Sequence, residues 1–508
     1  MTKTRIAAID IGTNSIRCIV AEVVKDGRFK VLDDEKVTVR LGENLTKTGL
    51  ISETAAQRAL EAVRRFRILL DGFKVASVEA IATSAVRSAA NGRELVDALT
   101  KELGHEVRII SGEEEAELAA SSALSNFDMS GKRFVMADIG GGSLELVTAF
   151  GNHIEECYTL DLGTVLMTER FLVSDPIKPD EMQQLQRHVR EQLKTIFADE
   201  KVAVNTIIGS GGSMTSLGGM VMNKRGDAYS SVHGYEVLRS DVVHLLAMLM
   251  RKDLKARRLI PGLNPDRADI ITAGIAVINE LMKLLGANRL LVNERGIREG
   301  LIIRAMKRLG VMPEVTLPRN WRDSVLEFAR SCQVDETHAL HVARLALSIF
   351  DALALPFSLK KSDRKLLEAA AILHDAGYFI SYGSHHKHSY HLIRHADLFG
   401  FSPRERELIA QIARYHRKSV PKRKHESFQT LREKDRQLVS RLGGILRMAD
   451  GLDRRRAGFV QEVLCEFGGT VITLKLESTE NISVEVFGGN SKKDLFEKAF
   501  GAGVVFVT

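Results

Sequence analysis

The sequence predicts an α/β fold in which two successive domains share one design, followed by a mainly helical region and a small α+β region. Three observations predict it. The motif D-I-G-x-x-S occurs twice, from Asp10 and from Asp138, each time at the end of an apolar run. Each copy is followed by strand and helix patterns in a similar order. The rest of the 508-residue chain, which is long enough for three or four domains, is mostly helical in pattern.

The composition is typical of a soluble globular protein, with 44% hydrophobic and 27% charged residues. The four cysteines lie far apart and form no C-x-x-C pair, which argues against a disulfide framework or a thiolate zinc site. No apolar segment has the length that a signal peptide or a membrane span needs. We therefore expect a cytoplasmic protein with no membrane partner.

The formal net charge of +7 favours an anionic partner such as nucleic acid, anionic lipid or a polyphosphate. Aromatic residues make up only 6% of the chain, so stacking platforms for nucleic-acid bases are poorly supplied. Many basic proteins bind none of these partners. The charge alone therefore chooses no function.

The first domain is expected over residues 1–125. Strand-like runs open it, a helical stretch with apolar residues at helical spacing follows, and two short β-rich runs then each precede a helix. In order, these segments are residues 5–12, 15–24, 28–41, 53–73, 78–86 and 107–112.

The second domain, residues 126–311, repeats the order with a strand, a glycine turn, a second strand, helices, a glycine-rich loop and a short apolar strand. The loop is residues 207–219 and the short strand is 289–292. Prolines in residues 311–320 indicate a linker to the helical region at 312–458. The last region, 459–508, is expected to be a small α+β domain, with strand-like runs at 461–467, 470–476, 481–487 and 504–508 and a helix at 493–500.

The two D-I-G-x-x-S segments are the strongest indication of function. Either one alone is explained by a hairpin with a glycine turn. As a pair they suggest more, because glycine lets backbone N–H groups approach an anion and serine or threonine adds hydroxyl donors. An acid at the end of each strand can hold hydrated Mg²⁺. Two such turns facing each other would form one phosphate site between the halves of a duplicated fold.

Further motifs carry a resemblance. IDIGTNSIR, ATSAVRSAANG, ISGEEEAEL, ADIGGGSLEL and NERGIREGL, in this order, resemble the Ppx/GppA family of exopolyphosphatases and guanosine pentaphosphate phosphohydrolases. The resemblance implies two domains of the actin/hexokinase/Hsp70 (ribonuclease H-like) fold. It implies a Mg²⁺-dependent, processive exopolyphosphatase that releases orthophosphate from inorganic polyphosphate. The alternatives are hydrolysis of guanosine pentaphosphate and a non-catalytic sensor of polyphosphate or guanosine tetra- and pentaphosphate. A third alternative is that the histidine-rich site of the helical region carries the chemistry.

The resemblance also implies roles for single residues. Three carboxylates at the ends of the motifs would hold Mg²⁺ or Mn²⁺, and Arg87 would neutralise a phosphate oxygen. The metal ligands are Asp10, Asp138 and Glu145, the last also assigned to water positioning in catalysis. The phosphate donors are Thr13, Asn14, Ser15, Gly140, Gly141, Gly142 and Ser143.

The segment S-G-E-E-E carries two interpretations. It has the pattern of a helix capping box, with Ser111 as N-cap and Glu114 at the third helical position. In the family resemblance, Glu113 is the general base that activates the attacking water. Both hold if the capping role of Glu114 leaves Glu113 free to face the cleft. The 209–219 segment departs from the family's usual G-T after Gly-Ser-Gly, which leaves nucleotide binding there open.

The helical region carries His341, the pair His374-Asp375, His388, His416 and Asp450 on successive helices. The spacing H…HD…D resembles the HD superfamily and predicts an all-α HD-like domain. A second divalent metal would be held by His341, His374, Asp375 and Asp450; the alternatives are hydrogen-bonded helix histidines or a domain that binds substrate without metal.

A basic stretch at 414–428 is by default a solvated loop. It also fits a track for a long polyanion, and polynucleotide binding there stays open. The track residues would be Arg417, Lys418, Lys422, Arg423 and Lys424. A homodimer is expected from the family resemblance.

Overall fold

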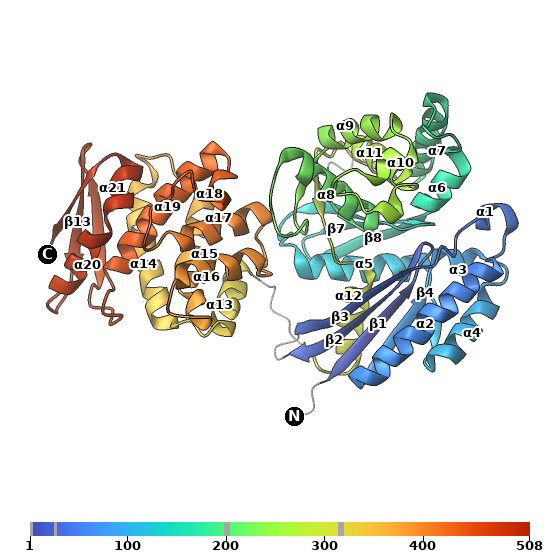
Figure 1. Cartoon of the computed structure of the whole chain (residues 1–508), viewed down its shortest axis with the longest axis horizontal. Coiled ribbons are helices and arrows are strands. Elements are labelled where there is room, and N and C mark those ends of the chain that lie inside the picture. The colour runs from blue at the N-terminus through green and yellow to red at the C-terminus, as the bar shows by residue number, and fades with distance from the viewer. Residues whose placement is uncertain (1–3, 25–27, 198–203, 313–319) are drawn as a thin grey trace. The chain divides into compact units, whose positions relative to one another are not determined.

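The computed structural model describes residues 4–24, 28–197, 204–312 and 320–508 (Figure 1). They form two compact units. The first contains residues 1–225 and 231–318, and the second contains 226–230 and 319–508. Every helix in the described ranges is too short or too polar to cross a lipid bilayer.

The first unit contains two sheets with the same central pattern. In each, the first strand pairs antiparallel with the second and parallel with a later strand that follows helices. The five-stranded sheet has the order β3-β2-β1-β4-β5, and the six-stranded sheet the order β10-β11-β9-β6-β7-β8. The strands are β1 (Arg5–Ile11), β2 (Ser15–Val24), β3 (Arg28–Thr38), β4 (Ser77–Ala82), β5 (Val107–Ile109), β6 (Arg133–Ile139), β7 (Leu144–Phe150), β8 (His153–Leu160), β9 (Thr206–Ser210), β10 (Glu236–Leu238) and β11 (Arg289–Val292). This repeat confirms the predicted duplication.

Alternating residues of β1 build two cores. Ala7 and Ile9 pack under α2 (Glu53–Phe73) and α4 (Gly92–Leu103), which cover one face of the five-stranded sheet (Figure 1). Ile6 and Ala8 face the other side and pack against α12 (Ile297–Arg308). Successive side chains of a strand point to opposite faces of the sheet, so the sequence alone predicts that these residues alternate between the two cores.

Helix α5 (Gly112–Asn126) joins the two sheets. Its small residues, among them Ala116 and Ala119, pack on the six-stranded sheet, while Leu118 belongs to the core around α12. A Cβ at Gly300 of α12 would lie 2.1 Å from the Leu118 carbonyl oxygen, so only glycine allows this approach.

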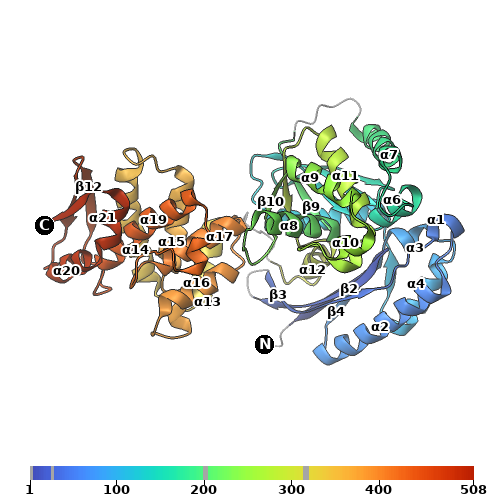
Figure 2. The same ribbon diagram turned by 45° about the horizontal axis from the view of Figure 1, so that its top comes forward.

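The other helices of the first unit lie on or beside the sheets, and α9 and α11 pack side by side (Figure 2). They are α1 (Leu45–Thr48), α3 (Ser84–Ser88), α6 (Thr164–Phe171), α7 (Pro179–Phe197), α8 (Gly212–Arg225), α9 (Arg239–Met250), α10 (Leu254–Arg258), η2 (Pro265–Arg267) and α11 (Ile271–Leu284).

The second unit is a helical bundle with a small sheet, and both contribute to one core. Val342 and Leu446 from the helices and Val463 and Phe496 from the C-terminal part belong to the same buried cluster. The elements are α13 (Trp321–Ser331), α14 (Glu336–Ala354), α15 (Lys361–Leu373), η3 (Ala376–Phe379), α16 (His385–His395), α17 (Pro403–Arg414), α18 (Glu426–Gln429), α19 (Glu433–Gly451), β12 (Glu462–Phe467), β13 (Val471–Glu477), α20 (Ser483–Lys492), α21 (Asp494–Phe500) and β14 (Gly503–Val507).

Two segments differ from the sequence-based expectation. The strand-like run 481–487 is largely helical in α20, where buried Glu485 accepts a hydrogen bond from Arg455 at 2.8 Å. This tertiary contact outweighs a β-type pattern. The expected loop at 207–219 is the end of β9 and the start of α8, joined at Gly211. Most of the predicted linker at 311–320 lies outside the described residues.

Candidate functional site

The two D-I-G-x-x-S turns have the same backbone geometry. In the first, the Gly12 N–H donates to the Ser15 carbonyl at 3.2 Å; in the second, the Gly140 N–H donates to the Ser143 carbonyl at 3.0 Å. Register then pairs Asp10 with Arg17 and Asp138 with Glu145 across each hairpin. The duplicated unit therefore places an arginine on one side and a carboxylate on the other.

Glycine allows the second turn to approach the first. A Cβ added to Gly141 would lie 2.7 Å from the Cβ of Thr13, and one added to Gly142 would lie 2.3 Å from Ser84 Oγ. Both distances are shorter than any ordinary contact. Gly141 and Gly142 are thus needed to bring the two halves together.

The turns line one cavity, which offers about 150 Å³ to water-sized groups. It contains most of the residues predicted for phosphate and metal binding: Asp10, Thr13, Asn14, Ser15, Asp138, Gly140, Gly141, Ser143 and Glu145. Gly142 does not line the cavity and packs closely against Ser84, which does.

The carboxylates of the cavity are half-buried or buried, and they are close enough to repel one another. Burial raises the pKa of Asp10, and burial together with the charge of Asp10 raises the pKa of Asp138 to about 6. Burial, then the charge of Glu115, raises the pKa of Glu145 well above its usual value. Glu145 Oε1 has no hydrogen-bond partner among the described residues. A divalent cation would remove both the repulsion and this unpaired oxygen, so the residues fit Mg²⁺ or Mn²⁺.

The structure does not bring Glu113, the glutamate expected to be the general base, to the cavity. Glu113 is exposed and does not line the cavity, whereas Glu115 does. Ser111 is the N-cap, as expected, and its hydroxyl accepts from the Glu114 N–H at 3.1 Å. The Glu114 side chain turns away to Arg108 and Arg304 instead of closing a capping box.

Helical spacing explains why Glu115 faces inward. It lies one turn before Ala119 and two turns before Ser122, both of which are buried. Glu113 lies one turn before exposed Glu117. The choice between the two glutamates follows once the buried face of α5 is known. Burial raises the pKa of Glu115 to about 8.

Arg87 holds this glutamate rather than lining the cavity itself. Its Nη1 donates to Glu115 Oε2 at 3.1 Å and to the carbonyl oxygen of Ile110 at 2.9 Å. In this structure Arg87 forms an ion pair with Glu115 that fixes the position of the carboxylate.

Four arginines that received no role from the sequence line the same cavity: Arg17, Arg267, Arg295 and Arg298. Arg298 pairs with Asp34, and Arg267 donates to Ser213 Oγ at 3.1 Å. Arg17, Arg295 and Arg298 lie within the motifs, which was a usable signal. Arg267 lies in no motif, so only the tertiary structure identifies it.

The start of α8 completes the cavity wall. Gly211 has φ +95°, and a Cβ there would meet the Ile139 carbonyl oxygen at 2.6 Å, so glycine is required. Gly212 and Thr215 of the first turn of α8 line the cavity. The partial positive charge of a helix N-terminus favours an anion here.

Residues 19–309 match the model of the Ppx/GppA phosphatase family, and residues 321–488 match Ppx/GppA phosphatase, domain III. The chain belongs to the Ppx/GppA phosphatase family. It is therefore an enzyme of a phosphatase family, and the cavity between its two related sheets is the candidate active site.

Relatives of this Ppx/GppA protein include enzymes named for polyphosphate. Exopolyphosphatase 2 of Mycobacterium tuberculosis is 33% identical over 318 residues, which are 60% of this chain and 99% of the relative. An exopolyphosphatase from Cytophaga hutchinsonii has a TM-score of 0.57 at 29% identity, covering 61% of this chain and all of that structure. The Aquifex aeolicus family member has a TM-score of 0.53 at 27% identity, covering 61% and 99%.

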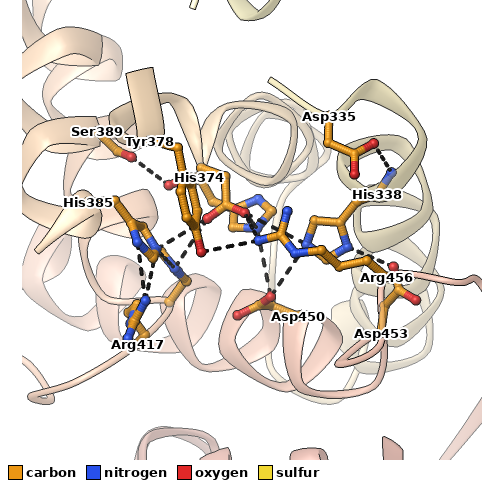
Figure 3. A network of polar contacts seen from close by, with 12 residues as sticks. Asp335, His338, His374, Tyr378, His385, Ser389, Arg417, Asp450, Asp453 and Arg456 are labelled. Carbon is orange, nitrogen blue, oxygen red and sulfur yellow. Dashed lines mark hydrogen bonds and ion pairs between the residues drawn. The ribbon is translucent and has the colours of Figure 1, made fainter. Parts of the chain in front are cut away.

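In the second unit of this Ppx/GppA chain, the structure brings together a different set of histidines from the one expected (Figure 3). His374, Asp375 and Asp450 are together, as predicted. His341 is not with them: it faces Arg344 at 2.9 Å, and His338 takes its place. His385 rather than His388 comes from α16, and His416 also joins.

The position of His338 on α14 explains the correction. His338 shares a helical face with Val342 and Leu345, both buried, so its ring points into the bundle. Burial lowers its pKa, but the carboxylates of Asp450 and Asp453 outweigh burial and raise the pKa of His338 to about 9.

A glycine lets α16 approach the His374-Asp375 pair. A Cβ at Gly377 would lie 2.0 Å from the His385 carbonyl oxygen. In this close approach the Gly377 N–H donates to Ser389 Oγ at 2.9 Å, and that hydroxyl donates to the His374 carbonyl at 2.6 Å (Figure 3). The backbone around the histidines is thus fixed by packing.

The basic stretch divides into two parts. Arg417 is half-buried and its Nη1 lies 3.1 Å from His385 Nδ1. The other four predicted track residues are exposed: Lys418, Lys422, Arg423 and Lys424. Arg417 therefore belongs to the histidine cluster rather than to a surface track.

Proposed function

We propose that the protein is an exopolyphosphatase that hydrolyses the terminal phosphoanhydride bond of inorganic polyphosphate, with Mg²⁺ or Mn²⁺ as cofactor. One observation carries the proposal: two glycine turns meet at a cavity that also contains a carboxylate cluster and a glutamate held by an arginine. These are the parts that binding a phosphoryl group and activating water require.

The terminal phosphoryl group would be bound from both sides by the turns around Thr13 and Gly141 and by the first turn of α8. Asp10, Asp138 and Glu145 would hold the cation. When bound, the cation would neutralise phosphate oxygens and lower the pKa of the nearby carboxyl groups, so that Glu115 is ionised near neutral pH.

Glu115 would act as the general base and Arg87 would keep it in place. As the water oxygen forms a bond to the terminal phosphorus, Glu115 accepts the water proton. The bond between that phosphorus and the bridging oxygen breaks, and the electron pair stays on the shortened chain. Orthophosphate leaves, and Glu115 returns its proton to solvent or product.

The size of the cavity favours an inorganic chain end over a buried nucleoside. Pockets that enclose a drug-sized molecule measure about 300–1,000 Å³, whereas this one offers about 150 Å³. The names of the relatives also support polyphosphate. The same proposal includes a cytoplasmic homodimer and processive action along a chain that the exposed basic stretch would contact.

The test is orthophosphate release by the purified protein with Mg²⁺, from long-chain polyphosphate and from guanosine pentaphosphate at equal terminal-phosphate concentration. Faster release from polyphosphate supports the proposal. Faster release from the nucleotide would replace it with guanosine pentaphosphate hydrolysis. Binding of polyphosphate with no release from either would make the protein a sensor.

A further inference from the structure

The second unit contains two adjacent clusters of side chains that could bind a metal ion, and neither cluster includes a residue of the phosphoryl cavity. In each cluster, the ligand atoms lie within 4.8 Å of one another, and most of the residues are buried. The first cluster is His338, His374 and Asp450, and the second is Asp375, His385 and His416.

Asp375 connects the clusters through its two oxygens. Oδ2 lies 3.5 Å from His374 Nε2 and 3.9 Å from His338 Nε2. Oδ1 lies 3.3 Å from His385 Nε2 and 3.7 Å from His416 Nε2. Ligand atoms bonded to one tetrahedral ion at 2.0–2.2 Å are about 3.4 Å apart. The spacing matches two ions that share one carboxylate.

Hydrogen bonds on the far side of the rings orient the histidines. His374 Nδ1 lies 2.7 Å from the Ala371 carbonyl oxygen, and His416 Nδ1 lies 2.7 Å from that of Ala413. A carbonyl can only accept, so each Nδ1 carries a proton, and the Nε2 atom on the other side of each ring faces the cluster. Such fixing of the ring is typical of metal-bound histidine.

Protein partners do not satisfy these nitrogens. Among the described residues, neither His338 Nε2 nor His374 Nε2 has a hydrogen-bond partner, although both are buried. His416 Nε2 faces His385 Nε2 at 3.2 Å, where a single proton at most can lie between them. Ordinary hydrogen-bonded core histidines would not leave buried nitrogens directed at one another.

We propose that the second unit holds two divalent first-row transition metal ions bridged by Asp375, and that this centre binds a phosphate group. One ion would be bound by His338, His374, Asp375 and Asp450, and the other by Asp375, His385 and His416. The ligands are imidazole and carboxylate without thiolate, which suits manganese, iron, cobalt or zinc better than Mg²⁺.

The charges around the centre indicate the anion. Arg456 donates to Asp375 Oδ2 at 2.5 Å and Lys492 pairs with Asp450, so each cation contacts a carboxylate that would bind the ions. The positive charge of two divalent ions exceeds the negative charge of the two carboxylates, Asp375 and Asp450. Arg456, Lys492 and Arg417 add further positive charge. The loaded centre therefore requires anions. Arg456, with its side chain 38% exposed, is placed to bind a phosphate from solvent.

The first experiment titrates the full-length, metal-stripped protein with Co²⁺ in excess Mg²⁺ and records cobalt content and visible absorption. We expect two cobalt ions per chain with the absorption of nitrogen ligation. Asp375→Asn should weaken cobalt binding tenfold or more and abolish the second ion. Uptake of fewer than two ions by the wild-type protein overturns the two-metal proposal, and this result does not depend on any variant folding.

Matched variants separate the centre from other sites. His341→Ala and His388→Ala remove histidines of the same helices that lie outside the cluster, and both should keep two ions. Asp138→Asn disrupts the candidate active site and should also keep both. Loss of cobalt in Asp138→Asn would assign the metal to the first unit and overturn the proposal, whatever the fate of the proposed function.

The phosphate part is tested with inorganic phosphate added to the cobalt-loaded protein. We expect a change in the visible spectrum, and Arg456→Ala should weaken phosphate binding about tenfold while the cobalt content stays at two ions. An unchanged spectrum at millimolar phosphate would overturn phosphate binding. An equal response of wild-type protein and Arg456→Ala would remove Arg456 from that role.

Discussion

The direction of a single side chain decides the chemistry of the candidate active site. Three consecutive glutamates begin α5, and they have three different environments: Glu113 is exposed, Glu114 pairs with arginines, and Glu115 reaches the cavity. Residue type alone could not distinguish them. The buried face of the helix distinguishes them, because buried Ala119 and Ser122 lie one turn and two turns after Glu115.

Replacing Glu115 tests this assignment at the residue scale. Glu115→Gln should lower kcat for orthophosphate release by about 10²–10⁴-fold while polyphosphate binding persists, because the amide cannot accept the water proton. Glu113→Gln is the matched control and should stay within about twofold of the wild-type rate. If the two variants exchange these results, Glu113 is the base.

The buried carboxylates also predict a gain in stability. The pKa of Asp138 is raised to about 6 in the folded protein. Ionisation of Asp138 therefore lowers the free energy of unfolding, and this loss grows as pH rises from the ordinary pKa of aspartate to the raised one. With chelator present, Asp138→Asn should raise the free energy of unfolding at pH 8 by about 1–3 kcal/mol and leave it nearly unchanged at pH 4.

Thermal or denaturant unfolding measures this difference. The exposed Asp161→Asn should change stability little at either pH. Mg²⁺ should stabilise the wild-type protein more than Asp138→Asn, because the cation binds the charge that the variant lacks. A destabilised Asp138→Asn at pH 8 would contradict the repulsion described for the carboxylate cluster.

At the scale of elements, close contacts between backbones hold the cavity together. The two glycine turns meet at Thr13 and Gly141, and α12 reaches α5 through Gly300. Helix α5 carries Glu115, and the segment before α12 carries Arg295. The close contact between α5 and α12 therefore sets the distance between these two side chains.

Gly300→Ala tests the contact between α12 and α5. Its Cβ would lie 2.1 Å from the Leu118 carbonyl oxygen, and backbone cannot move aside as a side chain can. We expect a loss of about 1–3 kcal/mol of stability and a lower kcat. Gly72→Ala in α2 is the matched control: nothing lies within 4 Å of its Cβ, so it should be neutral or stabilising.

At the scale of the whole molecule, each unit has its own chemistry. The first has carboxylates and glycine turns for a phosphoryl group, and the second has a histidine cluster and an exposed basic stretch. A role of the basic stretch in guiding polyphosphate can be tested only in the complete chain, which contains both units.

Charge reversal at Lys422, Arg423 and Lys424 tests that role. KM should rise more for long than for short polyphosphate, because a longer chain has more phosphates to bind lysine and arginine beyond those at the active site, and the difference should shrink with added salt. The wild-type protein assayed with both chain lengths is the reference. Equal increases for both lengths would leave the stretch as a solvated loop.

The sequence by itself determined the duplicated α/β design, the two glycine turns and the acids at their strand ends, because these depend on local periodicity and on residues adjacent in the chain. It also located the His374-Asp375 pair. Only the tertiary structure decided which of neighbouring candidates faces inward: Glu115 over Glu113, His338 over His341 and His385 over His388.

The physical reason is the same in each case. A helix turns by about 100° per residue, so neighbours on one helix point to different surroundings. Which of those surroundings is a cavity depends on elements distant in the chain, such as β7 beside α5 or α19 beside α14. Arg267, which lies in no motif and still lines the cavity, is the plainest example.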